Sequence, residues 1–111
     1  MLVKLKVTPP LALTPTTILV QPSSQTVNEA ATATFRVVAS GSGLTYQWQR
    51  NSVNIAGATA ANYSLPNVTI AADNGAQFRV VVSGTGGPSV TSPNALLTVT
   101  LAAPYKKVSR S

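Results

Sequence analysis

Short segments in which apolar and polar residues alternate recur along the chain, and turn residues separate them. Every second side chain is apolar in residues 31–39, and residues 76–82 follow the same pattern. A period of two places the apolar side chains on one face of a strand, and no window of about 11 to 18 residues shows the 3.6-residue period of an amphipathic helix. The sequence therefore predicts an all-β fold with no helix longer than one turn.

Glycine, proline and asparagine divide the chain into about seven strands, with a corner between two of them that has room for one helical turn. Helical crossovers, which parallel strands need, are absent, so we expect an antiparallel sandwich of two sheets. The predicted strands are residues 18–27 with a kink at Pro22, 31–39, 44–50, 53–55, 62–65, 76–83 and 95–101, and the corner is residues 67–74.

A length of 111 residues suits one sandwich domain with extensions at both ends. We expect an N-terminal arm with a proline-rich linker at 1–16, the domain at 17–101 and a basic tail at 102–111. Residues 2–8 alternate and form a predicted strand, which can pair with an exposed sheet edge of its own copy or of a neighbour. The alternative is an ordinary extra edge strand or the remnant of a preceding repeat.

The net charge of +6 is concentrated at the two ends of the chain. Residues 17–100 contain three arginines and two acids, Glu29 and Asp73, so the net charge of this part is 3 − 2 = +1. We expect the terminal charges to dock on an acidic protein surface in a salt-sensitive way. Nucleic acid is not an expected partner, because Tyr105 is the one aromatic residue beside these charges, and no apolar run is long enough to span a membrane.

The chain has no cysteine and no histidine, which excludes disulfides, thiol nucleophiles and imidazole bases. Glu29 and Asp73 are the only acids, and they precede different predicted strands, so we expect neither paired carboxylates nor a calcium site. The sequence predicts a protein that is not an enzyme and holds no cofactor or metal.

Three motifs occur in the order of an immunoglobulin-like domain: Phe35-x-Val37-x-Ala39-x-Gly41, Tyr46-x-Trp48 and Asp73-x-Gly75-x-x-Phe78-x-Val80. Over about residues 18–100 the chain resembles the bacterial and bacteriophage, I-set-like members of that family. The resemblance implies that Trp48 packs in the core on Val37 and Val80, which stand where the family often has its two cysteines. It also implies that Phe78 replaces the corner tyrosine one residue late, which a local bulge would explain. The implied core residues are Phe35, Val37, Trp48, Leu65, Phe78, Val80, Leu97 and Val99.

The same resemblance implies a structural or binding module on the surface of a phage virion, such as a capsid decoration or fibre-like protein. The alternative is one repeat of a bacterial cell-surface or adhesin protein that binds protein or carbohydrate. The amino terminus lacks the apolar core of a secretory signal, so we expect no export by that route, and the sequons at Asn62 and Asn67 are interpreted as chance matches. A homo-oligomer stays open. The residues expected to anchor the module are Val3, Lys4, Leu5, Lys6 and Val7, supported by Lys106, Lys107 and Arg110.

Overall fold

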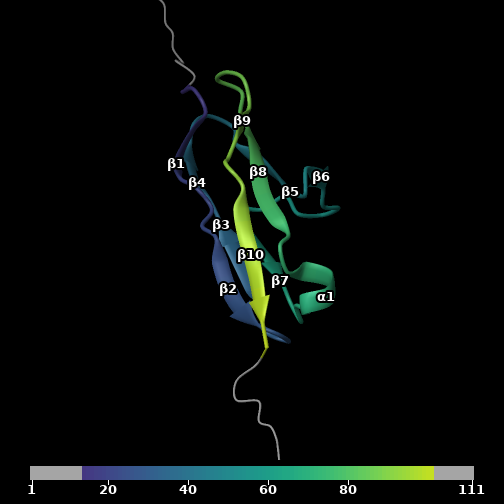
Figure 1. Ribbon diagram of the computed structural model, residues 1–111. Helices are drawn as coiled ribbons and strands as arrows, with labels where there is room; N and C mark the ends of the chain where they lie inside the picture. The colour runs from purple at the N-terminus through teal and green to yellow at the C-terminus, as the bar shows by residue number, and fades with distance from the viewer. Residues whose placement is uncertain (1–13, 102–111) are drawn as a thin grey trace, which may run out of the picture.

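The computed structural model describes residues 14–101, which form two stacked β-sheets and one short helix (Figure 1). The elements, in chain order, are β1 (Thr17–Val20), β2 (Gln25–Asn28), β3 (Ala33–Arg36), β4 (Val38–Ser40), β5 (Thr45–Arg50), β6 (Val53–Asn54), β7 (Asn62–Leu65), α1 (Ile70–Asp73), β8 (Gln77–Ser83), β9 (Val90–Thr91) and β10 (Ala95–Thr100).

Seven predicted strands become ten segments within residues 14–101, because two of them are interrupted and one further strand is added. The first strand is split into β1 and β2 on either side of Pro22, as the kink there predicts, because proline cannot donate to a ladder. The second is split into β3 and β4 at Val37. The added strand is β9, which lies between the predicted strands at 76–83 and 95–101, and Pro93 separates it from β10.

One layer contains the pairs β1–β4 and β3–β7, since β3 and β4 continue one another across Val37. The other layer has the order β2–β10–β8–β5–β6, with β9 paired to β8. The first strand thus moves from one sheet to the other at Pro22. All pairs are antiparallel except β2 with β10, which run parallel with Leu97 opposite Gln25. The sequence does not predict this parallel pair, because β2 and β10 lie near opposite ends of the domain sequence and no turn links them directly.

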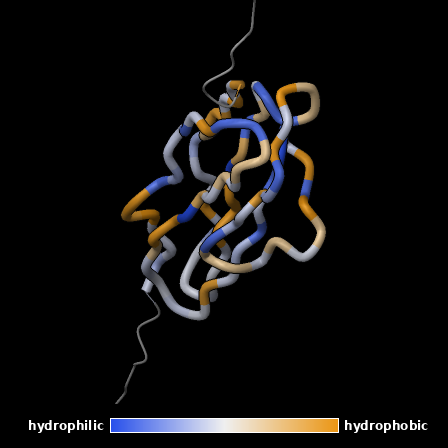
Figure 2. Tube along the Cα trace, turned by 90° about the horizontal axis from the view of Figure 1, so that it is seen from below, coloured by the Kyte–Doolittle hydropathy of each residue, from blue (hydrophilic) through white to orange (hydrophobic). Residues whose placement is uncertain are grey.

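The core lies between the layers and follows the predicted alternation, which Figure 2 shows as hydrophobic and hydrophilic stretches along the trace. The indole of Trp48 is fully buried, and Trp48 lies opposite Val80 in the register of β5 with β8. Leu65 is only partly buried and packs against the core from the edge strand β7. The other predicted core residues are all buried, namely Phe35, Val37, Trp48, Phe78, Val80, Leu97 and Val99.

Phe78 stacks on Phe35 in the core, with ring centroids 4.6 Å apart. The register of β5 with β8 is continuous from Thr45↔Ser83 to Arg50↔Phe78, so no bulge lies between these two strands. On the other side of β8 the register shifts by one residue between Val81↔Thr91 and Phe78↔Ala95, which is a local irregularity beside Phe78. The extra residue therefore lies in the segment between β9 and β10 and not in β8. A second ring, that of Tyr63, lies 5.9 Å from the Phe78 ring.

The last residues of the predicted linker belong to the folded body. Ser42 donates its backbone N–H to the Thr14 carbonyl at 3.2 Å, and Thr16 is buried. The described chain begins beside this β4–β5 loop and ends after β10 at the opposite end of the sandwich (Figure 1). The predicted anchoring residues at 3–7 and at 106–110 lie outside the described residues.

Candidate functional site

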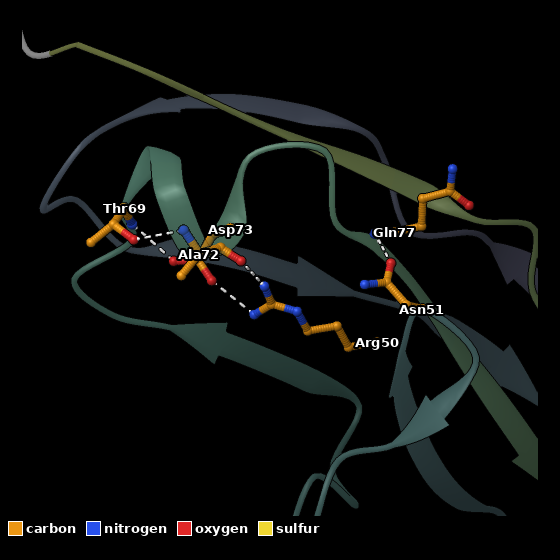
Figure 3. A network of polar contacts seen from close by, with 6 residues as sticks. All are labelled: Arg50, Asn51, Thr69, Ala72, Asp73 and Gln77. Atoms are coloured by element: carbon orange, nitrogen blue, oxygen red, sulfur yellow. Dashed lines mark hydrogen bonds and ion pairs between the residues drawn. The ribbon is translucent and has the colours of Figure 1, made fainter.

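Both acidic side chains of the chain bind the amino-terminal turn of α1. Glu29, in the β2–β3 turn, accepts the Ile70 N–H on Oε2 at 3.1 Å. Asp73 accepts the Thr69 N–H on Oδ2 at 2.8 Å, and the Thr69 hydroxyl accepts the Ala72 N–H at 3.1 Å (Figure 3). These bonds satisfy backbone donors that a helix end leaves without partners, and they place negative charge where the helix dipole favours it.

Arg50 reaches from the end of β5 to the same corner (Figure 3). Its Nη1 donates to Asp73 Oδ1 at 2.8 Å, its Nη2 donates to the Ala72 carbonyl, and its guanidinium lies 5.6 Å from the centre of the Phe78 ring. Burial alone would raise the pKa of Asp73, but the Thr69 N–H and the Arg50 hydrogen bond and charge outweigh it and lower the pKa below the ordinary value of 3.8. Asp73 is therefore held ionised as a structural anchor.

The sequence separates the two acids into turns before different strands and does not predict that they meet at α1. The sequence does indicate where the helix begins, because threonine is favoured at the N-cap position of Thr69 and Asp73 is an acid near the helix start. The contact from Glu29 spans 41 positions in the chain, and no local pattern indicates it. Within residues 14–101 no cluster of three potential metal ligands occurs.

A row of polar side chains crosses the outer face of the larger sheet. Asn54 on β6 accepts a hydrogen bond from Gln49 on β5 at 2.8 Å, and Gln49 accepts one from Arg79 on β8 at 2.7 Å. Arg79 is half-buried and donates this hydrogen bond through its Nε. On the other side of Arg79, Asn94 donates to Gln77 at 2.9 Å. We call these five residues the Arg79 face.

The sequence predicts that Gln49 and Arg79 point outward, because their neighbours Trp48 and Val80 point into the core. It does not predict the hydrogen-bonded row, which depends on the register Gln49↔Arg79 and Gln49↔Asn54 between strands. A sequence-based search for catalytic groups passes over this surface, because amides carry no charge and do not titrate.

The outer face of the smaller sheet carries a different surface. A groove of about 230 Å³ lies at the β1–β2 kink and is lined by Val20, Gln25 and Arg36 among others. Beside it, Val20 pairs with Val38, and both side chains are exposed together with Leu19. Arg36 is exposed and makes no ion pair with any residue in the described range. Each sheet therefore presents one guanidinium on its outer side.

The comparisons with known proteins define the fold. No family model matches the chain, and no curated protein does. Among solved structures, a chimeric titin Z1Z2 that carries an exogenous decorin peptide is 24% identical with a TM-score of 0.66, covering 82% of this chain and 99% of its own. The N-terminal Ig1–2 module of Drosophila receptor protein tyrosine phosphatase DLAR is 20% identical with a TM-score of 0.66 and covers 80% of this chain. Sidekick-1 immunoglobulin domains 1–5 are 19% identical with a TM-score of 0.68 and cover 89%.

This chain spans half of the DLAR module and about a fifth of the Sidekick-1 structure. At these identities the likeness concerns the fold. The predicted immunoglobulin-like β-sandwich is confirmed. The bacterial or phage affiliation and the I-set type stay predictions. In the described part of the chain, no helix has the length and hydropathy needed to cross a membrane.

Proposed function

We propose that this chain is a non-catalytic attachment module that binds a larger protein assembly through its terminal segments, and that the assembly is the surface of a phage particle. The distribution of charge supports the proposal best. Five of the eight cationic residues lie in residues 1–16 and 102–111. The only two acidic side chains, those of Glu29 and Asp73, accept backbone N–H groups at the start of α1. The chain has two acidic residues for eight cationic ones, so the terminal cations outnumber the acidic side chains of their own chain.

Uncompensated charges at both ends of a rigid body favour encounter with an acidic surface, and their effect falls as salt increases. The sandwich has a closed core and positions both ends of the described chain far apart, so each terminal segment can engage a separate contact (Figure 1). The choice of a virion as the assembly is supported by the resemblance to phage immunoglobulin-like domains.

A co-sedimentation experiment tests this function. The full chain and a variant with Lys4, Lys6, Lys106, Lys107 and Arg110 replaced by glutamine are mixed with purified virions of the phage that encodes it. We expect the full chain to sediment with the particles at about 50 mM salt and to be released at about 500 mM, where charges are screened within a few ångströms.

The five-residue variant is expected to stay in the supernatant at both salt concentrations. The control is Arg36→Gln, which removes one exposed charge from the sandwich and leaves the terminal charges in place; it is expected to sediment like the full chain. Equal sedimentation of the five-residue variant and the full chain would contradict attachment by the terminal charges.

A second candidate function is that of one module in a longer bacterial cell-surface protein. The observation that favours it is the exit of the described chain at opposite ends of the sandwich, which is the geometry that end-to-end arrays require (Figure 1). Solved structures of similar fold contain several such modules in one chain, for example the tandem Ig repeats of Dlar. Detection of the chain in the cell-envelope fraction, as part of a longer polypeptide, would favour this candidate over the virion.

A further inference from the structure

We propose that the Arg79 face is a second binding site, in the folded body, for a carboxylate on an acidic peptide or protein surface. The face consists of Asn54, Gln49, Arg79, Gln77 and Asn94 on the outer side of the larger sheet. The site is separate from the terminal segments, so its test can fail or succeed independently of the proposed attachment function.

The hydrogen-bonded row holds the Arg79 guanidinium in one orientation. Gln49 Oε1 accepts from Arg79 Nε at 2.7 Å, and Asn54 Oδ1 in turn accepts from Gln49 Nε2 at 2.8 Å. Each side chain is thus fixed by its neighbour on the next strand of a rigid ladder. A guanidinium anchored through Nε has both terminal nitrogens left, and these form the planar fork that binds a carboxylate through two parallel hydrogen bonds.

No acidic side chain of the same chain can occupy this fork. The chain contains two Asp and Glu residues in total. Asp73 is paired with Arg50, and Glu29 binds the Ile70 N–H at α1. Arg79 therefore makes no ion pair within residues 14–101, although the residue is half-buried. A partial burial of this kind strengthens the attraction for an incoming anion relative to a fully solvated arginine.

The neighbouring amides favour an acidic peptide over a lone anion. Gln77 lies two residues before Arg79 on β8 and accepts a hydrogen bond from Asn94, which precedes β10. Amide groups of this kind donate to and accept from a peptide backbone. The surface offers one cation surrounded by neutral hydrogen-bonding groups, which matches a carboxylate side chain flanked by main-chain amides. We therefore assign the partner as an acidic segment of a protein.

Arg36 provides a matched comparison. It is also an arginine on an outer sheet face without an ion-pair partner in the described range, but no hydrogen bond within that range fixes its guanidinium. If charge alone attracts acidic peptides, both arginines should respond equally. If the fixed orientation matters, Arg79 should respond more strongly.

The experiment titrates the full ¹⁵N-labelled chain with a capped tetraglutamate peptide at about 20 mM salt and follows each amide and the Arg79 Nε–H by NMR. A capped tetraglutamine peptide is the uncharged control. We expect saturable shifts at Arg79, Gln49 and Asn54 with tetraglutamate only. Arg79→Gln should weaken the binding at this face at least about tenfold, and Arg36→Gln should leave it unchanged.

Gln49→Glu is the sharpest variant, because it places a carboxylate of similar shape beside Arg79 Nε and neutralises the charge within the chain. It is expected to abolish the shifts at Arg79 while the resonances of the core stay in place. Shifts that rise linearly without saturation, that are equal at Arg36 and Arg79, or that persist in Gln49→Glu would overturn the proposal. Shifts confined to the terminal segments would overturn it as well, while supporting the proposed attachment function.

Discussion

At the scale of single residues, Trp48 closes the core. Its ring is fully buried and lies 6.4 Å from the Phe35 ring, and its Nε1–H donates to the Ala60 carbonyl at 2.8 Å. The backbone N–H of the same residue donates to the Ala58 carbonyl at 2.9 Å. Trp48 therefore fills the space between the sheets and also fixes the segment that leads from β6 to β7. This second role compensates in part for the missing disulfide.

Trp48→Phe should destabilise the fold by about 2–4 kcal/mol, because it leaves a void and removes the donor to the Ala60 carbonyl. Urea unfolding followed by circular dichroism measures the change. The control is Leu19→Ala, at a side chain that is 61% exposed, and it should change the stability by less than about 0.5 kcal/mol. Similar midpoints for the two variants would contradict the assigned role of the indole.

Asp73 connects stability to pH. Its pKa is lower in the folded chain than in the unfolded one, so its contribution is fully present above the ordinary pKa of 3.8 and is lost as pH falls through the lowered folded value. Asp73→Asn should cost about 1–3 kcal/mol near neutral pH, since one charge-assisted acceptor disappears. Arg50 is 29% exposed, so solvent screens the part due to the ion pair.

Urea unfolding at a series of pH values checks this prediction. The stability difference between the natural chain and Asp73→Asn should be constant above about pH 5 and shrink toward zero in strong acid, where Asp73 is protonated in both states. A difference that stays constant over the whole range would show that the charge of Asp73 contributes nothing.

At the scale of elements, the segment before β1 packs closely against two loops. A Cβ placed on Gly84 would lie 2.5 Å from Thr16 Oγ1 and 2.8 Å from the Ser42 carbonyl oxygen. The segment before β1, the β4–β5 loop and the turn after β8 therefore meet at a point with no room for a side chain. Thr16, Ser42 and Gly84 are between 26 and 68 positions apart in the chain, so no local sequence pattern reveals this contact.

Gly84→Ala should therefore destabilise the fold by about 1–3 kcal/mol through overpacking against backbone. Gly87 lies in the same turn, and the nearest atom to a Cβ there is 4.0 Å away. Gly87→Ala should be neutral or should stabilise by up to about 1 kcal/mol through the unfolded state. Thermal unfolding of the two variants distinguishes them, and equal melting temperatures would contradict the close approach.

The elements that the sequence predicts are those that local alternation determines. The strand at residues 62–65 has the predicted bounds of β7, and the inward residues of β8 are the predicted Phe78, Val80 and Val82. Alternation decides which face is buried, but it does not specify partners. Three features are therefore visible only in the tertiary structure: the parallel β2–β10 pair, the contact of Glu29 with α1 and the Gln49–Arg79 row.

At the scale of the whole molecule, the buried apolar residues of the described range 14–101 form one core cluster. A fragment with these bounds should unfold in urea with a free energy within about 0.5 kcal/mol of the full chain, since distant segments contribute additively. It should also lose the salt-sensitive attachment proposed for the terminal segments. A fragment that fails to unfold cooperatively would show that residues outside this range contribute to the sandwich.

The central claim is that two sheets close around one buried indole without any covalent link. Because Trp48 is the only tryptophan, its fluorescence reports on this claim without a label. We predict that emission from the native chain is blue-shifted from that of the urea-unfolded chain and is poorly quenched by acrylamide. Emission and quenching that are the same in native buffer and in urea would place Trp48 in solvent and would contradict the account.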